Sequence, residues 1–438
     1  MAIQILDQAN IRLYEMGKES RGEIIWRKTD CILVYNGDEL TTSNDIGGFR
    51  EHEKPSLETI KPMSEFRNVD FKLREYEWND LNFSNSDDWL GIIDEFYANG
   101  GGMLIGRAGT GKSYVSIKGG KHFDKMGIKH KSLAFTNKAT IQLSGLTIHN
   151  FLKIDTEGKI NLEWAKEVSK TLKVIFVDEI SMISSHLWCL LCELKMITNI
   201  KFILIGDYRQ LPPVENLNID WFNHPAIHYL TNSMRCELKD MKRYDEKLWD
   251  LLEEIWENGN FDFLKNVEEY SDEDLLNGTN ITYKNRTRKM INDRCMYLKW
   301  TDDAIYCKWY GKQDAYQQDA YLYADMPLLM FITTKDKKFK KNEVVKMVSV
   351  DEENFSITNG MNTETFKVKD FHMKCLVGYA TTIHKSQGDT VEGQLNIFDC
   401  DFITSKWLEK RSAKKDDRRA LYTALSRARK LSDIKICS

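Results

Sequence analysis

The chain has 438 residues, which is too long for one compact core and indicates about two to four domains. Apolar residues make up 42% and charged residues 29% of it, which excludes a disordered or fibrous protein. Its 62 basic and 66 acidic side chains give a net charge of −4, which excludes a strongly basic coat protein. No apolar run is long enough to span a membrane and no signal segment is present, so we expect a soluble, intracellular protein without membrane contacts.

Nine cysteines are scattered along the chain, which argues against a disulfide framework. Cys189 and Cys192 form a CxxC pair inside the helix-like segment SSHLWCLLCELKMI. No second pair stands at the spacing of a zinc site, so we interpret these two cysteines as packing residues of a helix.

Three apolar runs, at residues 103–105, 174–177 and 202–205, have the character of buried parallel strands. Each run ends in a glycine or an acidic residue, and helix-like stretches separate the runs. This alternation predicts an α/β protein with a doubly wound parallel sheet that delivers loops to a site.

A second half begins near residue 229, and its residues 343–368 alternate apolar and polar side chains around an Asn359-Gly360 turn. We interpret the latter as a small β-rich insertion. The predicted divisions are an N-terminal segment (1–54), a linker with a helical lead-in (55–95), a first α/β domain (96–228), a second α/β domain (229–325 and 374–438) and the insertion (326–373).

The string GRAGTGKS at residues 106–113 fits the phosphate-loop pattern G-x-x-x-x-G-K-[ST] at every fixed position, between a strand-like and a helix-like segment. Backbone N–H groups at a helix N-terminus can cradle phosphates, a lysine can bridge the β- and γ-phosphates, and a serine hydroxyl can hold Mg²⁺. The predicted nucleotide-binding residues are Gly106, Ala108, Gly109, Thr110, Gly111, Lys112 and Ser113.

Asp178 and Glu179 directly follow the apolar run 174–177. We predict that Asp178 contacts Mg²⁺ together with Ser113, and that Glu179 is the general base that activates water. A GTPase would need the guanine-reading pattern N-K-x-D, and the nearest string, at residues 137–140, lacks the aspartate. The predicted reaction is hydrolysis of a nucleoside triphosphate.

Further motifs follow in order, and together they resemble the superfamily 1B helicases of the RecD, Dda and Pif type. The strings are AFTNKATIQLSGLTIHNF (134–151), GDYRQLPPV (206–214), ATTIHKSQGDTV (380–391) and YTALSRAR (422–429). The resemblance covers about three-quarters of the chain, from residue 100 or so to the end. It implies two RecA-like parallel-sheet domains with ATP between them and a single strand of nucleic acid across their top.

The resemblance also implies roles for individual residues. Gln210 matches the glutamine that senses the γ-phosphate, and Gly388 matches a position beside the nucleotide. Arg235, in TNSMRC, and Arg427 match two arginines that reach ATP from the second domain, where a guanidinium neutralises charge on the transferred phosphoryl group. The implied catalytic residues are Lys112, Glu179, Gln210, Arg235 and Arg427.

Six residues match family positions on or near the nucleic acid, and their side chains can bond phosphates or stack on bases without reading sequence. They are Thr136, Thr147, His149, His384, Lys385 and Ser386. The glutamine that reads adenine in this family is missing from SNSDDWLGIIDEF, where Trp89 or a neighbour could substitute by stacking.

These features favour an ATP-dependent DNA helicase that uses Mg²⁺ and moves on single-stranded DNA, in replication, repair or recombination. The resemblance to the family implies 5′-to-3′ movement. The implied partners are single strands, duplex or fork junctions, and replication proteins or a polymerase module. An RNA-directed helicase and an ATPase clamp within a replication complex are the alternatives. The oligomeric state stays open, with a monomer compatible.

Residues 1–54 lie outside the helicase motifs. There a helix-like segment precedes the strand-like EIIWRKTDCILVYNG, and the region weakly resembles the palm of B-family DNA polymerases around Thr29-Asp30-Cys31. Fifty residues or so cannot form a polymerase domain, so the resemblance implies a remnant of a larger polymerase–helicase protein of a virus or mobile element. The alternative is an unrelated helix and strand.

Overall fold

The computed structural model describes residues 23–28, 31–35, 76–136, 139–140, 143–154, 160–213, 220–259, 261–265, 267–311, 316–334, 336, 338–400 and 416–437. Its contacts separate a small unit, Met1–Glu77 with Ser184–Glu193, from a large unit, Trp78–Ile183 with Leu194–Ser438. The large unit contains both predicted α/β domains except for residues 184–193 of the first.

In the small unit, strands β1 (Glu23–Lys28) and β2 (Cys31–Tyr35) pair antiparallel, and Lys28 lies opposite Cys31. The segment that we predicted as one strand-like stretch is therefore a hairpin, because its two apolar halves pair with each other. Thr29, Asp30 and the helix expected before residue 23 lie outside the described residues. The polymerase resemblance thus stays a prediction.

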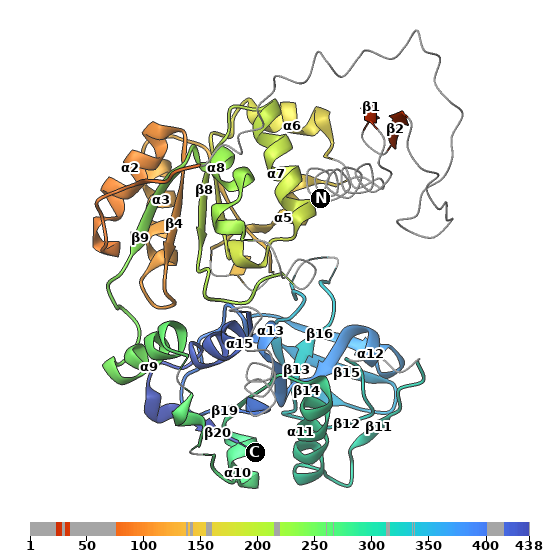
Figure 1. The fold of residues 1–438 in the computed structure, drawn as a ribbon. Helices are drawn as coiled ribbons and strands as arrows, with labels where there is room; N and C mark the ends of the chain where they lie inside the picture. Colours follow the sequence, from red (N-terminus) through yellow and green to blue (C-terminus); the bar gives the residue numbers. More distant parts are fainter. Residues whose placement is uncertain are drawn as a thin grey trace. The chain divides into compact units, whose positions relative to one another are not determined.

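The first α/β domain is built on a parallel sheet with strand order β3-β9-β4-β8-β7-β5-β6. Figure 1 labels its strands β9, β4 and β8. The three predicted apolar runs lie in β4, β8 and β7, which are neighbours in that order, and this prediction is confirmed. The strands are β3 (Asn79–Asp80), β4 (Gly101–Gly106), β5 (His130–Ala134), β6 (Leu146–Thr147), β7 (Val174–Asp178), β8 (Lys201–Gly206) and β9 (Met234–Leu238).

Helices pack closely against both faces of this sheet, as two successive glycines of β4 show. A Cβ on Gly102 would lie 2.0 Å from the Phe96 ring of α2, and one on Gly101 would lie 2.8 Å from the Leu230 carbonyl of α8. Successive strand residues point to opposite faces, so α2 and α8 lie on opposite sides. The α-helices are α2 (Trp89–Asn99), α3 (Lys112–Lys125), α5 (Ile148–Leu152), α6 (Leu162–Ser169), α7 (Ser185–Ile197) and α8 (Pro225–Thr231), and the 3₁₀ helices are η3 (Ser86–Asp88), η4 (Ile180–Met182) and η5 (Trp221–Asn223).

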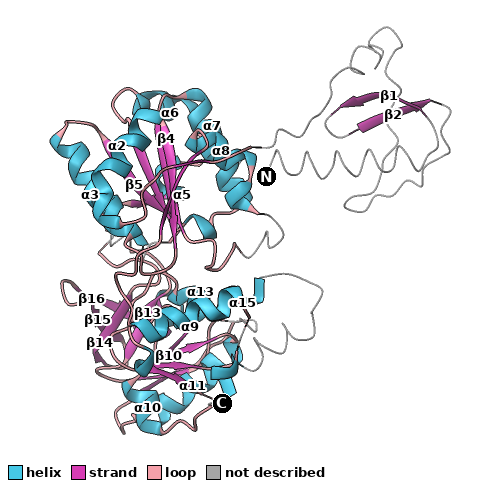
Figure 2. Ribbon diagram, turned by 60° about the vertical axis from the view of Figure 1, so that its left-hand side comes forward, coloured by secondary structure: helices cyan, strands magenta, loops and turns pink. Residues whose placement is uncertain are grey.

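The second α/β domain contains a parallel sheet of order β18-β10-β19-β20, flanked by helices (Figure 2). Its strands are β10 (Thr279–Thr282), β18 (Ala380–Thr382), β19 (Leu395–Ile397) and β20 (Ile434–Ile436). Its helices are α9 (Glu246–Glu257), η6 (Asp262–Lys265), α10 (Asp272–Asn277), α11 (Asn285–Leu298), α13 (Ile383–Ser386), α15 (Asp416–Leu425) and η8 (Leu431–Asp433).

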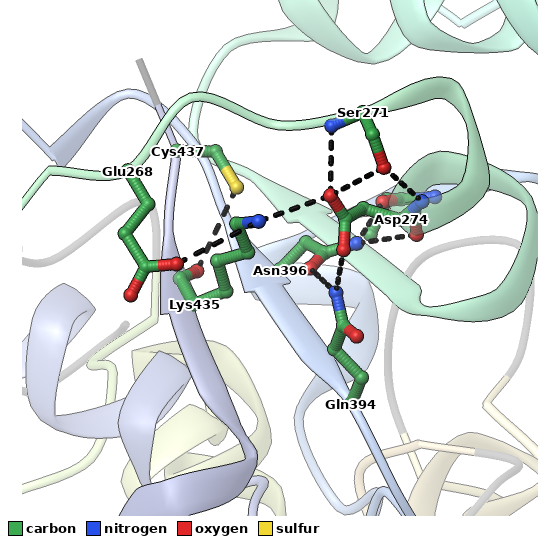
Figure 3. A network of polar contacts seen from close by, with 8 residues as sticks. Glu268, Ser271, Asp274, Gln394, Asn396, Lys435 and Cys437 are labelled. Carbon is green, nitrogen blue, oxygen red and sulfur yellow. Dashed lines mark hydrogen bonds and ion pairs between the residues drawn. The ribbon is translucent and has the colours of Figure 1, made fainter.

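A polar network joins helix α10 to two strands of this second sheet (Figure 3). The Asp274 carboxylate accepts hydrogen bonds from Ser271 at 2.7 Å, Gln394 at 2.7 Å and Lys435 Nζ at 3.0 Å. These hydrogen bonds hold the pKa of Asp274 well below its usual range. The fully buried Asn396 donates to the Asp274 carbonyl at 2.8 Å, so the helix and the sheet are tied together at several points.

The predicted insertion forms an antiparallel sheet of order β16-β15-β14-β13-β17, and the predicted Asn359-Gly360 turn connects β15 to β16. Its elements are β13 (Pro327–Met330), β14 (Val344–Val350), β15 (Asn354–Thr358), β16 (Thr363–Lys367), η7 (Val368–Asp370), α12 (Phe371–Lys374) and β17 (Cys375–Val377). A separate hairpin, β11 (Ile305–Cys307) with β12 (Ala320–Leu322), precedes it.

Three predicted boundaries differ from these sheets. Strand β9 starts after residue 229 but pairs with β4 and β3, so it belongs to the first domain. Strand β3, in the predicted linker, is the edge of that same sheet. Strand β17 lies beyond residue 373 but pairs with β13, so it extends the insertion. In each case the pairing partner is distant in sequence, and local patterns do not reveal it.

Candidate nucleotide site and nucleic-acid face

The predicted phosphate loop connects β4 to α3, with Gly106 ending the strand and Lys112 opening the helix. Gly111 has φ +90°, and a Cβ there would lie 2.6 Å from Ser86 Oγ, so only glycine fits. Lys112 Nζ donates to the carbonyl oxygens of Gly106 and Arg107, both at 2.7 Å. The lysine therefore lies against the loop, as a phosphate-binding lysine would.

Two other loop residues are held from within the protein. The buried Thr110 donates its hydroxyl to the Arg107 carbonyl at 2.8 Å. The Ala108 N–H donates to the hydroxyl of Tyr422, at 3.0 Å, on α15 of the second domain. The loop is thus shaped by its own hydrogen bonds and by one contact from the other domain.

Asp178 ends β7 inside the protein and contacts the loop. Burial raises its pKa, while hydrogen bonds from the Glu179 N–H, at 2.7 Å, and the Ser113 hydroxyl lower it. A Mg²⁺ ion prefers oxygen ligands and usually takes only one or two carboxylates from a protein. The hydroxyl of Ser113 and the carboxylate of Asp178 are already in contact, so this donor set fits Mg²⁺ bound with a nucleotide.

Glu179 follows with a left-handed backbone, φ +53°, which turns its side chain away from the direction of the strand. Its Oε2 accepts a hydrogen bond from Thr136 Oγ1 at 3.1 Å. Burial and the neighbouring Asp178 raise the pKa of Glu179 to about 7. A carboxylate with a pKa in this range has the basicity of a general base at neutral pH.

Gln210 follows β8 and contacts both Asp207 of the first domain and Gln387 of the second. Its Nε2 donates to Asp207 Oδ2 at 3.3 Å, and its Oε1 accepts from Gln387 Nε2 at 3.3 Å. Gln387 also donates to Ser181 Oγ at 3.4 Å. Gln387 stands beside the predicted Gly388, and sequence reasoning passed over it although it lies in the same IHKSQG motif.

A cavity of about 380 Å³ collects these residues. Arg427 and Gly388 of the second domain line it together with residues of the first domain. The buried Arg427 donates to the Asp389 and Thr423 carbonyls at 3.1 and 2.9 Å, and burial lowers its pKa. Further lining residues, which we had not predicted as site residues, are Tyr114, Ala139, Ser181, Gly206, Asp207, Lys242, Arg243 and Arg429.

Arg235 lies elsewhere, and its predicted position in the second domain is wrong. It is on β9 of the first sheet, because that strand pairs in parallel register with β4. Its guanidinium makes two hydrogen bonds to Asp80, at 2.6 and 2.8 Å, and it does not line the 380 Å³ cavity. Trp89, suggested for base stacking, is also outside that cavity and packs edge-on against His122 at 6.0 Å.

The predicted nucleic-acid residues of the first domain lie after β5, at the end of β6 and in the first turn of helix α5. Thr136 is half-buried beside Glu179, as described above. Thr147 caps helix α5 by accepting the Asn150 N–H at 3.2 Å. His149 is exposed and packs against Phe135, with ring centroids 6.1 Å apart.

The predicted nucleic-acid residues of the second domain lie on the short helix α13. Lys385 Nζ lies 4.4 Å above the Tyr316 ring and borders a larger cavity, of about 1040 Å³, beside strand β18. His384 is half-buried near Tyr283, and burial lowers its pKa. Ser386 differs from the prediction, since it is 1% exposed and its hydroxyl donates to the Ile383 carbonyl at 2.9 Å. Ser386 therefore has a structural contact in place of a free hydroxyl.

The AAA domain family matches residues 90–216, which hold the phosphate loop, the acidic pair and Gln210. The ATP-dependent DNA helicase Pif1 of Campylobacter jejuni is 25% identical over 417 residues, covering 77% of this chain and 88% of the relative. The helicase of the same name from Bdellovibrio bacteriovorus is 24% identical over 342 residues, covering 66% of this chain and 76% of the relative.

Solved structures show the same fold. Pif1 helicase from Candida albicans superimposes with a TM-score of 0.57 at 18% identity, covering 82% of this chain and 95% of that one. Bacteroides Pif1 bound to single-stranded DNA gives a TM-score of 0.59 at 16% identity, covering 82% and 93%. The predicted architecture of two RecA-like domains is thereby confirmed. Within the described residues, no helix is long and apolar enough to cross a membrane.

Proposed function

We propose that this chain, a Pif1-like helicase of superfamily 1B, hydrolyses ATP in the 380 Å³ cavity and uses that energy to move along single-stranded DNA and open duplexes. One observation carries the proposal. The phosphate loop, Glu179 and Gln210 of the first domain share this cavity with Arg427 and Gly388 of the second. A nucleotide bound there contacts both domains, so its hydrolysis changes the contacts between them.

The residues divide the chemistry among them. Lys112 and the loop N–H groups bind the β- and γ-phosphates, and Arg427 neutralises charge on the transferred phosphoryl group. Glu179, with its pKa of about 7, accepts a proton from the attacking water. When bound at Ser113 and Asp178, Mg²⁺ would supply further charge neutralisation at the phosphates.

Gln210 and Gln387 connect the nucleotide site to the helix that is predicted to contact the strand. Gln210 contacts Asp207 on the nucleotide side and Gln387 of the second domain. Lys385 lies two residues before Gln387, on the helix that carries the predicted strand contacts. Closing the domains over ATP and reopening them after hydrolysis alternates the affinity for the strand, and this alternation yields a step.

Single-stranded DNA and fork junctions are the proposed substrates, with 5′-to-3′ movement and a role in replication, repair or recombination. The support is that one structural relative, at a TM-score of 0.59, is bound to single-stranded DNA and another, at 0.60, is described as unwinding forked DNA. A polymerase module or other replication proteins are proposed as partners.

Strand displacement on duplexes with a 5′ or a 3′ single-stranded tail tests this proposal. Both duplexes receive ATP and Mg²⁺, and each is prepared with a DNA and an RNA loading strand. Lys112→Ala is the inactive variant, and Lys121→Ala, an exposed lysine on the same helix, is its matched control. We expect unwinding of the 5′-tailed DNA duplex by the wild type and by Lys121→Ala only.

The other outcomes separate the alternatives. Preference for the 3′ tail would contradict the proposed direction, and preference for the RNA strand would favour an RNA-directed motor. Strand-stimulated ATP hydrolysis without unwinding, together with strand binding that survives Lys112→Ala, would favour an ATPase clamp.

A further inference from the structure

Thr136 contacts the predicted general base, Glu179, and is itself predicted to contact the strand. Its hydroxyl donates a hydrogen bond to Glu179 Oε2 at 3.1 Å and accepts one from the Ala139 N–H at 3.2 Å. A threonine hydroxyl has only one proton to donate. In this structure that proton is committed to the predicted general base.

We also predict that the same hydroxyl donates to a different acceptor, a phosphate of the strand. Thr136 lies in the AFTNKAT segment after β5, at a position that we predict to bond a phosphate of the strand. A phosphate oxygen accepts hydrogen bonds and cannot donate one. The Ala139 N–H already uses an acceptor site of Thr136, so a phosphate can be bound only by the proton now given to Glu179.

Glu179 is held on its other side as well. A Cβ on Gly388 would lie 2.7 Å from Glu179 Oε1, so Gly388 of the second domain lies beside that oxygen and leaves room for it only because it is a glycine. The left-handed backbone of Glu179 further limits where the carboxylate can turn. The hydrogen bond from Thr136 thus restrains the other carboxylate oxygen, Oε2.

We propose that Thr136 is a positioning residue that couples the strand to ATP hydrolysis, by transferring its single hydrogen bond from Glu179 to a phosphate of the bound strand. This inference rests on the proposed function. Without a strand, Thr136 holds Glu179 back from the attacking water. With a strand bound, Glu179 is released, and hydrolysis accelerates. Linkage makes the effect reciprocal, so a state that needs Glu179 free also favours strand binding.

Thr136→Val tests this coupling because valine keeps the shape of the side chain and removes the proton. The ATPase rate is measured with and without a saturating single strand of oligodeoxythymidine, together with the affinity for that strand. Losing a hydrogen bond to a charged group is expected to raise the unstimulated rate roughly tenfold. The ratio of stimulated to unstimulated rates falls correspondingly, and the strand binds more weakly.

Two further variants keep the test decisive. Thr136→Ser retains the proton and should restore the wild-type ratio. Thr363→Val makes the same chemical change at an exposed position on β16 and should leave both rates unchanged. The melting temperature of each variant is measured as well, and equal values for Thr136→Val and Thr136→Ser show that a changed ratio does not come from a folding defect.

Two results would overturn the coupling. In one, Thr136→Val lowers both rates by the same factor, which means that Thr136 holds Glu179 in its productive position. In the other, the ratio is unchanged in Thr136→Val, or Thr136→Ser fails to restore it. The proposed function is judged separately, since it requires strand-stimulated hydrolysis by the wild type and none by Glu179→Gln.

Discussion

The hydroxyl of Tyr422 donates to Asp207 Oδ2 at 3.1 Å and accepts the Ala108 N–H at 3.0 Å. One buried group of α15 therefore joins two loops of the first domain beside the nucleotide cavity. Burial raises the pKa of Tyr422 well above its ordinary value, which keeps the proton on the hydroxyl and the donation intact. The second domain thus contacts the phosphate loop directly.

Tyr422→Phe should destabilise the protein and weaken ATP binding. The change leaves the Ala108 N–H without this acceptor and removes one donor from the Asp207 carboxylate, which keeps its hydrogen bond from Gln210, at a cost of about 1–3 kcal/mol. Differential scanning fluorimetry and the KM for ATP measure the two effects. Tyr321→Phe, at an exposed tyrosine of β12, is the control and should change neither quantity. An unchanged melting temperature for Tyr422→Phe would show that neither bond contributes to stability.

Gly388→Ala should lower the kcat of ATP hydrolysis, because the new methyl group would lie 2.7 Å from Glu179 Oε1. Gly360→Ala provides a matched control. Both glycines have φ +86°, but a Cβ on Gly360 would meet nothing within 4 Å, so the two variants share the backbone strain and differ in the collision. If both variants lost the same amount of activity at equal stability, contact with Glu179 would not be the cause.

Arg235→Ala should lower the melting temperature and leave the ATPase rate near that of the wild type. Arg235 is bonded to Asp80 outside the nucleotide cavity, and the pair is partly exposed, so its contribution to stability is under about 1 kcal/mol. A double-mutant cycle with Asp80→Asn should give less than additive losses. A loss of hydrolysis of about a thousandfold would instead place Arg235 at the transferred phosphate.

Asp274→Asn should destabilise the second domain at neutral pH and much less in acid. Hydrogen bonds from Gln394, Ser271 and Lys435 lower the pKa of Asp274, so its stabilising effect is present above the unfolded pKa of 3.8. It is lost as the pH falls through the folded value. The difference between the melting temperatures of the two proteins should therefore be constant from pH 7 to about pH 4 and narrow progressively at lower pH. Asp303→Asn, at an exposed position, should follow the wild type throughout, and a gap for Asp274→Asn that does not narrow at low pH would contradict the argument.

Local sequence determined the chemistry of this protein. The string GRAGTGKS can form a phosphate loop because glycine at residue 111 adopts φ +90° without strain, and an apolar run ending in Asp178 and Glu179 brings two acids to a strand end. The alternating segment around Asn359-Gly360 was sufficient to predict the insertion. These features depend on neighbours in the chain, so patterns of a few residues contain them.

Only the tertiary structure decided which distant groups meet. Arg235 belongs to the first domain because β9 pairs in parallel with β4. Tyr422 accepts a hydrogen bond from the Ala108 N–H although the two residues are 314 positions apart in the chain. The bond between Thr136 and Glu179 likewise depends on β5 and β7 being neighbours in the sheet. Strand order and domain contact arise from burying apolar faces together, which local sequence does not specify. The sequence alone therefore predicts the reacting groups, whereas the fold determines which other groups contact and restrain them.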